Sequence, residues 1–226
     1  MDIFTNNPAA LEHHPIKKAL NFFPKELKYF ENSYTESLPN GLNIPRSTLK
    51  GCPAVPNLYN QGYIIPLWSD LILQIKGNEW KYAFADGHSS IISHDNRQLP
   101  SCLNKYIHLK LISPWLISEK RGISWVWNKC MWNNFFMKYT HANLNILPGE
   151  TEYKTNHSTN INILQLAEDA YFDLKANEPL VHLIPITDKK TKISLHCIDK
   201  KEYAKIALKN NPTRWINNYR NNKKNS

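Results

Sequence analysis

Short strand-like runs follow one another along most of this chain, with no helical pattern between them. From Cys52 onward, apolar and polar residues alternate over stretches of about four to eight residues, the period of a half-buried strand. Gly77-Asn78 separates two such runs and is a strong hairpin signal. The runs lie at 63–68, 71–76, 79–84, 106–112, 115–117, 124–127, 135–139, 142–147, 159–166, 171–174 and 180–186. Strands in series favour a sandwich, jelly roll or barrel over a βαβ sheet.

The N-terminal region carries a different pattern. Residues 8–32 are predicted to be helical, because Phe23, Leu27 and Phe30 would share one face at helical spacing. Residues 33–50 contain two prolines and a glycine with few periodic apolar residues. This second stretch is therefore predicted to be a linker or an extended arm.

The C-terminal segment is basic and is also predicted to be helical. Asp199 and Glu202 fit a capping-box pattern, which marks the start of a helix. Most of the net charge of +9 lies from Asp199 onward, which indicates an acidic partner or a solvated end. We therefore expect a helical N-terminal extension and arm at 1–49, a β domain at 50–198 and a basic helical tail at 199–226.

Composition excludes several classes of protein. At 226 residues with 42% hydrophobic content, the chain can bury the core of one domain without disulfides or a metal. No apolar run approaches the roughly 20 residues of a membrane span. The first residues lack the basic and apolar regions of a signal peptide. The four cysteines, none in a Cys-x-x-Cys pair, are expected to be buried free thiols in a reducing compartment.

Short motifs over roughly Leu49 to Ile186 resemble a group of uncharacterised proteins of bacteriophages and some bacteria. The matching features are Thr48-x-Lys50-x-Cys52-Pro53, Gly62-Tyr63, Asp70, His88, Pro114-Trp115, Gly122, Pro148-Gly149 and Pro179. The resemblance implies that the protein acts in the cytoplasm of an infected bacterial cell or in the virion. That group has no activity to carry over to this chain.

The region from Ser113 to Ile186 also bears a distant resemblance to the dUTPase and dCTP deaminase superfamily, which has a β-clip fold. A strand, the Pro148-Gly149 turn, a second strand, another turn and a buried strand follow in the order of that superfamily. The resemblance implies a trimer, and it places Glu152 where an acid would activate water, with Tyr153 and Lys154 beside it. The expected fold is mainly all-β, a β-clip or jelly-roll-like sandwich with helical extensions at both ends.

Several nucleotide-binding motifs of that superfamily have no counterpart here. The Pro-Arg-Ser phosphate motif is missing from residues 126–131, and Asn177-Glu178-Pro179 replaces a Gly-Asp-Arg-like turn. Gly149 is the last glycine, so a Gly-rich phosphate lid is absent. A triphosphate needs backbone N–H groups and cations around it. These departures favour a fold retained for binding or assembly over nucleotide hydrolysis.

Three histidine and aspartate residues form a candidate metal site. His88, His94 and Asp95 lie within eight residues, and a jelly roll could hold a non-haem iron with them if His157 or His182 came near. Their spacing does not match the facial triad, so loop residues around a short strand are the alternative. No cofactor is expected.

Aromatic residues supply two further candidate surfaces. Trp125 and Trp127 share one strand face and, with Tyr153 and Lys154, are candidate ligand-binding residues, because aromatic rings stack on bases or sugars. A core or a subunit interface is the alternative for such a dense group. In the tail, aromatic and cationic side chains interleave as in nucleic-acid contact surfaces. These tail residues are Arg214, Trp215, Tyr219 and Arg220.

Three functional classes remain. The absence of coherent catalytic motifs favours an oligomeric phage-type structural or interaction protein over an enzyme. The alternatives are a degenerate dUTPase-like nucleotide-binding protein or hydrolase near Glu152, and a jelly-roll metal-dependent enzyme at His88. The expected partners are further copies of the chain, another phage or host protein, and nucleic acid through the tail, but no membrane.

Overall fold

The computed structural model describes residues 1–94, 103, 105–130, 144–154 and 157–208, and in these the chain is mainly β, as predicted. The elements of the N-terminal part are β1 (Asp2–Thr5), α1 (Pro8–His13), β2 (Lys17–Lys18), the 3-10 helices η1 (Ala19–Phe22) and η2 (Lys25–Tyr29), β3 (Ser33–Ser37), β4 (Asn43–Ser47) and α2 (Ala54–Tyr59). The central strands are β5 (Tyr63–Pro66), β6 (Leu71–Lys76), β7 (Glu79–Phe84), β8 (Ser90–Ser93), β9 (Tyr106–Ile112), β10 (Leu116–Ser118) and β11 (Ser124–Lys129). The remaining elements are β12 (Gly149–Glu152), β13 (Ile161–Leu166), β14 (Ala170–Leu174), β15 (Pro179–Pro185), β16 (Ser194–Cys197) and α4 (Lys200–Ala207). Within these ranges, no helix has the length and apolar character needed to cross a membrane.

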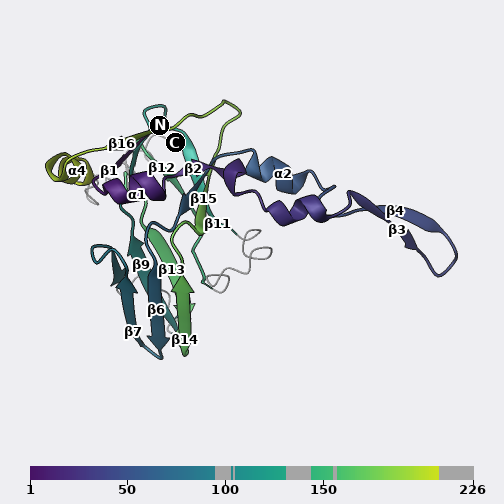
Figure 1. Ribbon diagram of the computed structural model, residues 1–226, viewed down its shortest axis with the longest axis horizontal. Coiled ribbons are helices and arrows are strands. Elements are labelled where there is room, and N and C mark those ends of the chain that lie inside the picture. The colour runs from purple at the N-terminus through teal and green to yellow at the C-terminus, as the bar shows by residue number, and fades with distance from the viewer. Residues whose placement is uncertain (95–102, 104, 131–143, 155–156, 209–226) are drawn as a thin grey trace, which may run out of the picture.

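Two three-stranded antiparallel sheets share the main core (Figure 1). Their strand orders are β14-β6-β7 and β13-β9-β8. On β6, Leu71, Leu73 and Ile75 are buried, while Leu109 and Leu111 are their counterparts on β9. All five belong to one continuous cluster of buried apolar side chains. The alternating pattern of the sequence therefore gives each of these strands one core face and one outer face.

A five-stranded sheet, in the order β12-β11-β15-β5-β2, is apolar on both faces at β5. Tyr63 and Ile65 belong to the main core, whereas Ile64 between them belongs to a second core. The other buried members of this second core are Ala19, Leu27, Val55, Tyr59 and Cys130. At the end of β5, the pairing with β15 shifts register between Pro179 and Val181, beside Pro66, which has no N–H to donate to a neighbouring strand.

The N-terminal region contains more strand and less helix than predicted. The helix expected over residues 8–32 was wrong beyond His13, because the chain continues as β2, η1 and η2. Pro15 and Pro24 explain the interruption, since a proline disfavours the helical conformation of the residue before it. In addition, β1 pairs antiparallel with β10 and parallel with β16, so the N-terminus belongs to the β body.

Several local predictions are confirmed. β6 and β7 pair across the Gly77-Asn78 turn, from Lys76 opposite Glu79 onward. The start of α4 has the predicted cap, in which the Asp199 carboxylate accepts a hydrogen bond of 2.8 Å from the backbone N–H of Glu202. The run predicted at 135–139 and the start of the run at 142–147 lie outside the described residues.

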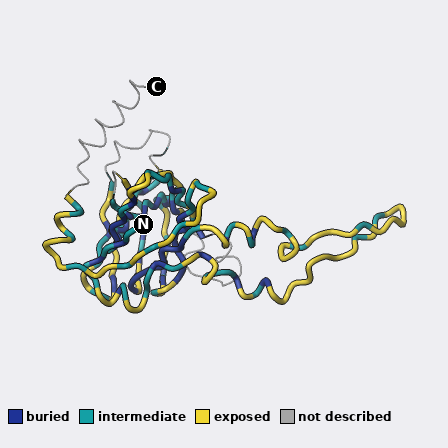
Figure 2. The backbone as a smooth tube through the Cα atoms, turned by 90° about the horizontal axis from the view of Figure 1, so that it is seen from above, coloured by how far each residue is buried: buried dark blue, intermediate teal, exposed yellow. Residues whose placement is uncertain are grey.

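A hairpin projects from the body between η2 and α2 (Figures 1 and 2). It consists of β3 and β4, which pair antiparallel from Ser33 opposite Ser47 to Ser37 opposite Asn43. Most of its residues are exposed, and its tip lies far from the two cores (Figure 2). The extended arm predicted at 33–50 is therefore a two-stranded sheet, and we call residues 33–47 the arm.

The cysteines differ in their environments. Cys130 is buried and free, and burial raises the pKa of its thiol far above its usual value. Cys52 is free and half-buried, whereas Cys197 is free and exposed. The expectation of buried free thiols therefore holds for Cys130 and was wrong for Cys197, while Cys102 lies outside the described residues.

Gly62, in the turn between α2 and β5, offers a test of the close approach of that turn to β15. Its φ of +71° favours glycine, and an added Cβ would lie 1.9 Å from the carbonyl oxygen of Leu183. We expect Gly62→Ala to lower the free energy of unfolding by about 3 kcal/mol, from backbone strain and overpacking together. Gly87→Ala is the matched control, with a φ of +64° but open space around the new Cβ, so it should cost about 1 kcal/mol. Urea denaturation of both variants measures the difference, and equal losses would contradict the close contact.

Candidate functional site

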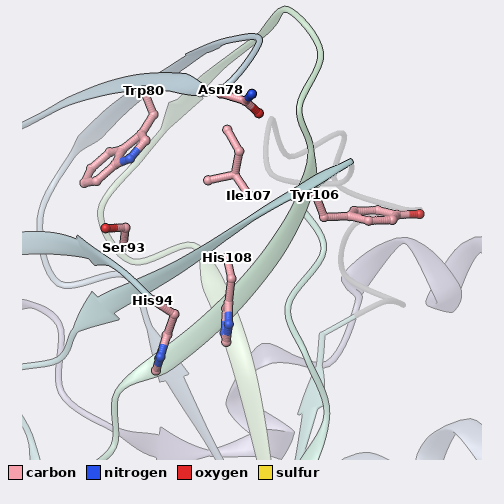
Figure 3. A pocket seen from close by; sticks show the side chains of 7 residues that line it. All are labelled: Asn78, Trp80, Ser93, His94, Tyr106, Ile107 and His108. Atoms are coloured by element: carbon pink, nitrogen blue, oxygen red, sulfur yellow. The ribbon is translucent and has the colours of Figure 1, made fainter. Parts of the chain in front are cut away.

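A cavity lies beside the β6–β7 turn, the end of β8 and the start of β9 (Figure 3). Its volume is about 340 Å³, near the lower limit for small-molecule sites. The residues that line it are Asn78, Trp80, Ser93, His94, Tyr106, Ile107 and His108. This described lining has no Asp, Glu, Lys or Arg, so it offers no fixed charge to a phosphate or a metal ion.

Two histidines stack against each other at this cavity (Figure 3). The ring centroids of His94 and His108 are 4.0 Å apart, and their planes differ by 15°. Sheet pairing brings them together, because the backbone N–H of His94 donates to the carbonyl of His108 at 2.8 Å. The Nε2–H of His94 lies 3.2 Å from the acceptor Oδ1 of Asn162 on β13. Both ring nitrogens of His108 are buried, and neither has a hydrogen-bond partner among the described residues.

This environment keeps His108 neutral near pH 7. Burial lowers the pKa of His108, and the neighbouring His94 lowers it further, while the Asn162 amide opposes the shift only in part. Burial also lowers the pKa of Lys110, which follows on the same face of β9. The arrangement therefore disfavours positive charge on this part of the sheet.

The candidate metal ligands do not assemble in the described part of the chain. His88 and His94 lie at opposite ends of β8, and Asp95 lies outside the described residues. The Nδ1–H of His157 donates to the carbonyl of Ile117 at 2.8 Å, and the Nε2–H of His182 donates to the carbonyl of Gln61 at 2.8 Å. Among the described residues, no three His, Cys, Asp or Glu side chains are placed to hold a metal ion.

The candidate ligand-binding residues near β12 divide between core and surface. Trp125 and Tyr153 are fully buried, with ring centroids 6.4 Å apart, so neither offers a free ring face to a ligand. Trp127 is half-buried and also packs against Tyr153 at 6.4 Å. Glu152 and Lys154 are exposed. Trp125 and Tyr153 are therefore core residues, which was the alternative to ligand binding.

The residues predicted to contact nucleic acid follow α4 in the sequence. Arg214, Trp215, Tyr219 and Arg220 all lie outside the described residues.

The arm has two chemically different faces. Cross-strand pairing puts Tyr34 beside Arg46 and Glu36 beside Ile44 on one face, and Arg46 Nε donates to the Glu36 carboxylate at 2.7 Å. Leu38 and Leu42 continue this row at the tip, where the N–H of Leu38 donates to the carbonyl of Leu42. We call this row the apolar face. The opposite, polar face contains Ser33, Thr35, Ser37, Asn43, Pro45 and Ser47.

The base of the arm is held by hydrogen bonds between its two legs. The N–H of Thr48 donates to the carbonyl of Asn32 at 3.0 Å, and the Thr48 hydroxyl donates to the carbonyl of Glu31. Lys50 Nζ donates to the carbonyl of Lys28 at 3.2 Å. Gly51 permits close approach of the legs, since a Cβ there would lie 2.1 Å from the Asn32 oxygen. These contacts fix the direction in which the arm leaves the body.

The Thr48-x-Lys50-x-Cys52-Pro53 motif therefore has a structural role at the base of the arm. Besides the bonds made by Thr48 and Lys50, the N–H of Cys52 donates to the carbonyl of Thr48 at 3.0 Å, and Pro53 directly precedes α2. The two faces of the arm were not predicted from the sequence. The alternating positions of Tyr34, Glu36 and Leu38 are a strand signal that could have indicated them.

Comparisons with protein-family models, with curated proteins and with solved structures found no match to this chain.

The buried imidazole of His108 predicts an acid-sensitive fold. The pKa of His108 is lower in the folded state than its value of about 6.5 in the unfolded chain. Below pH 6.5, the unfolded chain therefore binds a proton that the folded chain does not bind, and unfolding takes up that proton. Stability should therefore be full above pH 6.5 and fall as the pH decreases toward the lowered folded-state pKa. His108→Leu should reduce the stability difference between pH 8 and pH 5.5, whatever it does to stability at pH 8. Urea denaturation at both pH values measures this, and an unchanged difference would rule out the assignment to His108.

Proposed function

We propose that this protein is a structural or interaction protein, rather than an enzyme, and that its arm docks onto another protein chain. One observation carries the proposal: a projecting two-stranded sheet with an apolar face exposed to solvent on a firmly held base. On that face, Tyr34 is 54% exposed and Leu42 is 56% exposed.

Simple energetics support a partner for this face. An isolated two-stranded hairpin has marginal stability in water, because it buries little apolar surface. Covering Tyr34 and Leu42 would contribute about 25 cal/mol for each Å² of apolar area removed from water. The hydrogen-bonded base limits the freedom that the arm loses on docking, which favours association. Docking of the apolar face onto a protein is therefore more favourable for this arm than leaving that face in solvent.

The motif at the base connects this proposal with the phage-type resemblance. Thr48 and Lys50 belong to the motifs on which that resemblance rests, and they also bond the legs of the arm together. On this proposal, Thr48 and Lys50 are part of the pattern because their hydrogen bonds hold the base of the arm. On this proposal, the protein works in an assembly in the infected bacterial cell or in the virion.

Charged substitutions on the two faces of the arm test the proposal. Tyr34→Asp combined with Leu42→Asp would place unpaired charge in the docked contact, so retention of the partner should fall at least about tenfold. Ser33→Asp combined with Thr35→Asp adds the same charge to the polar face and should leave retention unchanged. Tagged full-length chains are purified from cells that contain the natural partners, and bound proteins are quantified by mass spectrometry. Equal retention of every bound protein by both variants would refute docking through the apolar face.

A further inference from the structure

We propose that the chain onto which the arm docks is a second copy of this protein, and that the acceptor is the outer face of the β14-β6-β7 sheet. This inference rests on the proposed function of the arm and identifies its partner. It follows from the distribution of exposed apolar side chains, from the charge on the two surfaces and from the direction of the arm.

The outer face of the β14-β6-β7 sheet has an apolar patch. Ile72 on β6 is 43% exposed, and Tyr171 on β14 is 63% exposed. The register places Ile72 between Ala83 on β7 and Asp173 on β14. Tyr171 lies two residues before Asp173 and therefore points to the same side of the sheet as its neighbours on that face. Ile72, Ala83 and Tyr171 therefore share one face of the sheet, with Tyr171 opposite Gln74 and diagonal to Ile72, and we call these three residues the acceptor patch.

Of the twelve exposed large apolar side chains among the described residues, eight lie in two places, while Tyr82, Ile92, Ile186 and Leu208 lie elsewhere. The first group occupies the arm and the segments that lead to it: Leu20, Tyr29, Phe30, Tyr34, Leu42 and Leu49. The second group consists of Ile72 and Tyr171, which lie on the outer face of the β14-β6-β7 sheet. Ile92 is the single described residue of this kind on the outer face of the β13-β9-β8 sheet. The chain therefore carries both an apolar projection and an apolar acceptor.

Charge favours these two surfaces for contact between identical chains. Most of the chain's net charge of +9 lies from Asp199 onward, so contact between identical chains is disfavoured at that segment. The arm, in contrast, contains one acid and one base, Glu36 and Arg46. The outward positions of the acceptor sheet are also balanced, with Lys76 and Lys81 against Glu79 and Asp173. Surfaces with balanced charge can approach each other without net repulsion.

The direction of the arm makes the contact intermolecular. The bonds between its legs fix the base, and the arm extends away from its own body in both views (Figures 1 and 2). It therefore does not fold back onto the Ile72 patch of the same chain. In a second copy, the two-stranded arm can pack on the three-stranded sheet about 10 Å apart, the usual spacing of stacked sheets. Reciprocal exchange of arms between two copies would close the assembly with two identical contacts.

Sedimentation equilibrium of the full chain tests this assignment with single substitutions. Leu42→Asp on the arm and Ile72→Asp on the acceptor should each raise the dissociation constant of the assembly at least about tenfold, because each buries an unpaired charge. The matched controls are Thr35→Asp on the polar face of the arm and Ile92→Asp on the other sheet, and both should associate like the unmodified chain. All four sites are solvent-accessible to some degree, and thermal unfolding checks that each variant folds.

A mixing experiment distinguishes docking from a general loss of association. A Leu42→Asp copy keeps its acceptor face, and an Ile72→Asp copy keeps its arm, so one intact contact can form between them. Fluorescently labelled copies of the two variants should therefore associate with each other, while neither variant associates with itself. Absence of association in the mixture would overturn the pairing of arm and acceptor.

The outcomes also separate this inference from the proposed function. If the unmodified chain stays monomeric at about 100 µM, docking onto a second copy is refuted. If Leu42→Asp dissociates the assembly and Ile72→Asp does not, the acceptor face is refuted and docking of the arm stands. Loss of a different protein in the purification experiment would then identify the partner that the arm binds instead.

Discussion

The apolar strand β5 connects the two parts of this molecule. Tyr63 and Ile65 pack into the main core between the sheets, and Ile64 packs in the opposite direction into the second core. Because all four residues of β5 are buried, the strand has no solvent face to accommodate a polar side chain. Loss of this two-sided packing would separate the β body from the elements that carry the arm.

The second core matters because it holds both legs of the arm. Leu27 comes from η2, directly before the arm, and Val55 and Tyr59 come from α2, directly after it. Ile64 contacts this cluster from the sheet, so the position of the arm is set by apolar packing and not by a flexible linker. The hydrogen bonds of Thr48 and Lys50 then define the direction in which the arm projects. Packing and hydrogen bonding together make a thin projection suitable for docking.

The sequence correctly predicted the elements whose signals lie in residues close to them in the chain. The Gly77-Asn78 turn identified β6 and β7, and the Asp199 cap identified the start of α4, because each signal lies within a few residues of its effect. The helix predicted beyond His13 failed where Pro15 and Pro24 outweighed the apolar spacing. Pairing of β1 with β16 could not be predicted, since no local pattern specifies contacts between the two ends of a chain.

The candidate site shows the same division between local and distant information. His94 stood out in the sequence beside Asp95 and His88, but its structural partner is His108, which the pairing of β8 with β9 brings against it. The composition around Trp125 suggested an aromatic surface or a core, and only the packing against Tyr153 separates these alternatives. Spacing along the chain therefore identified candidate residues, while the register of the sheets determined which of these residues are in contact.

The central position of β1 has a consequence for how the protein is made. β1 leaves the ribosome long before one of its two neighbours, β16, because Asp2 on β1 pairs with Ser194 on β16. Closing so long a loop costs entropy before any pairing is gained, and such contacts form slowly. During synthesis, the edge of β1 that pairs with β16 stays open until Ser194–Cys197 has emerged. An open strand edge invites pairing with other chains, so the interval before β16 emerges decides whether the nascent protein closes on itself or aggregates.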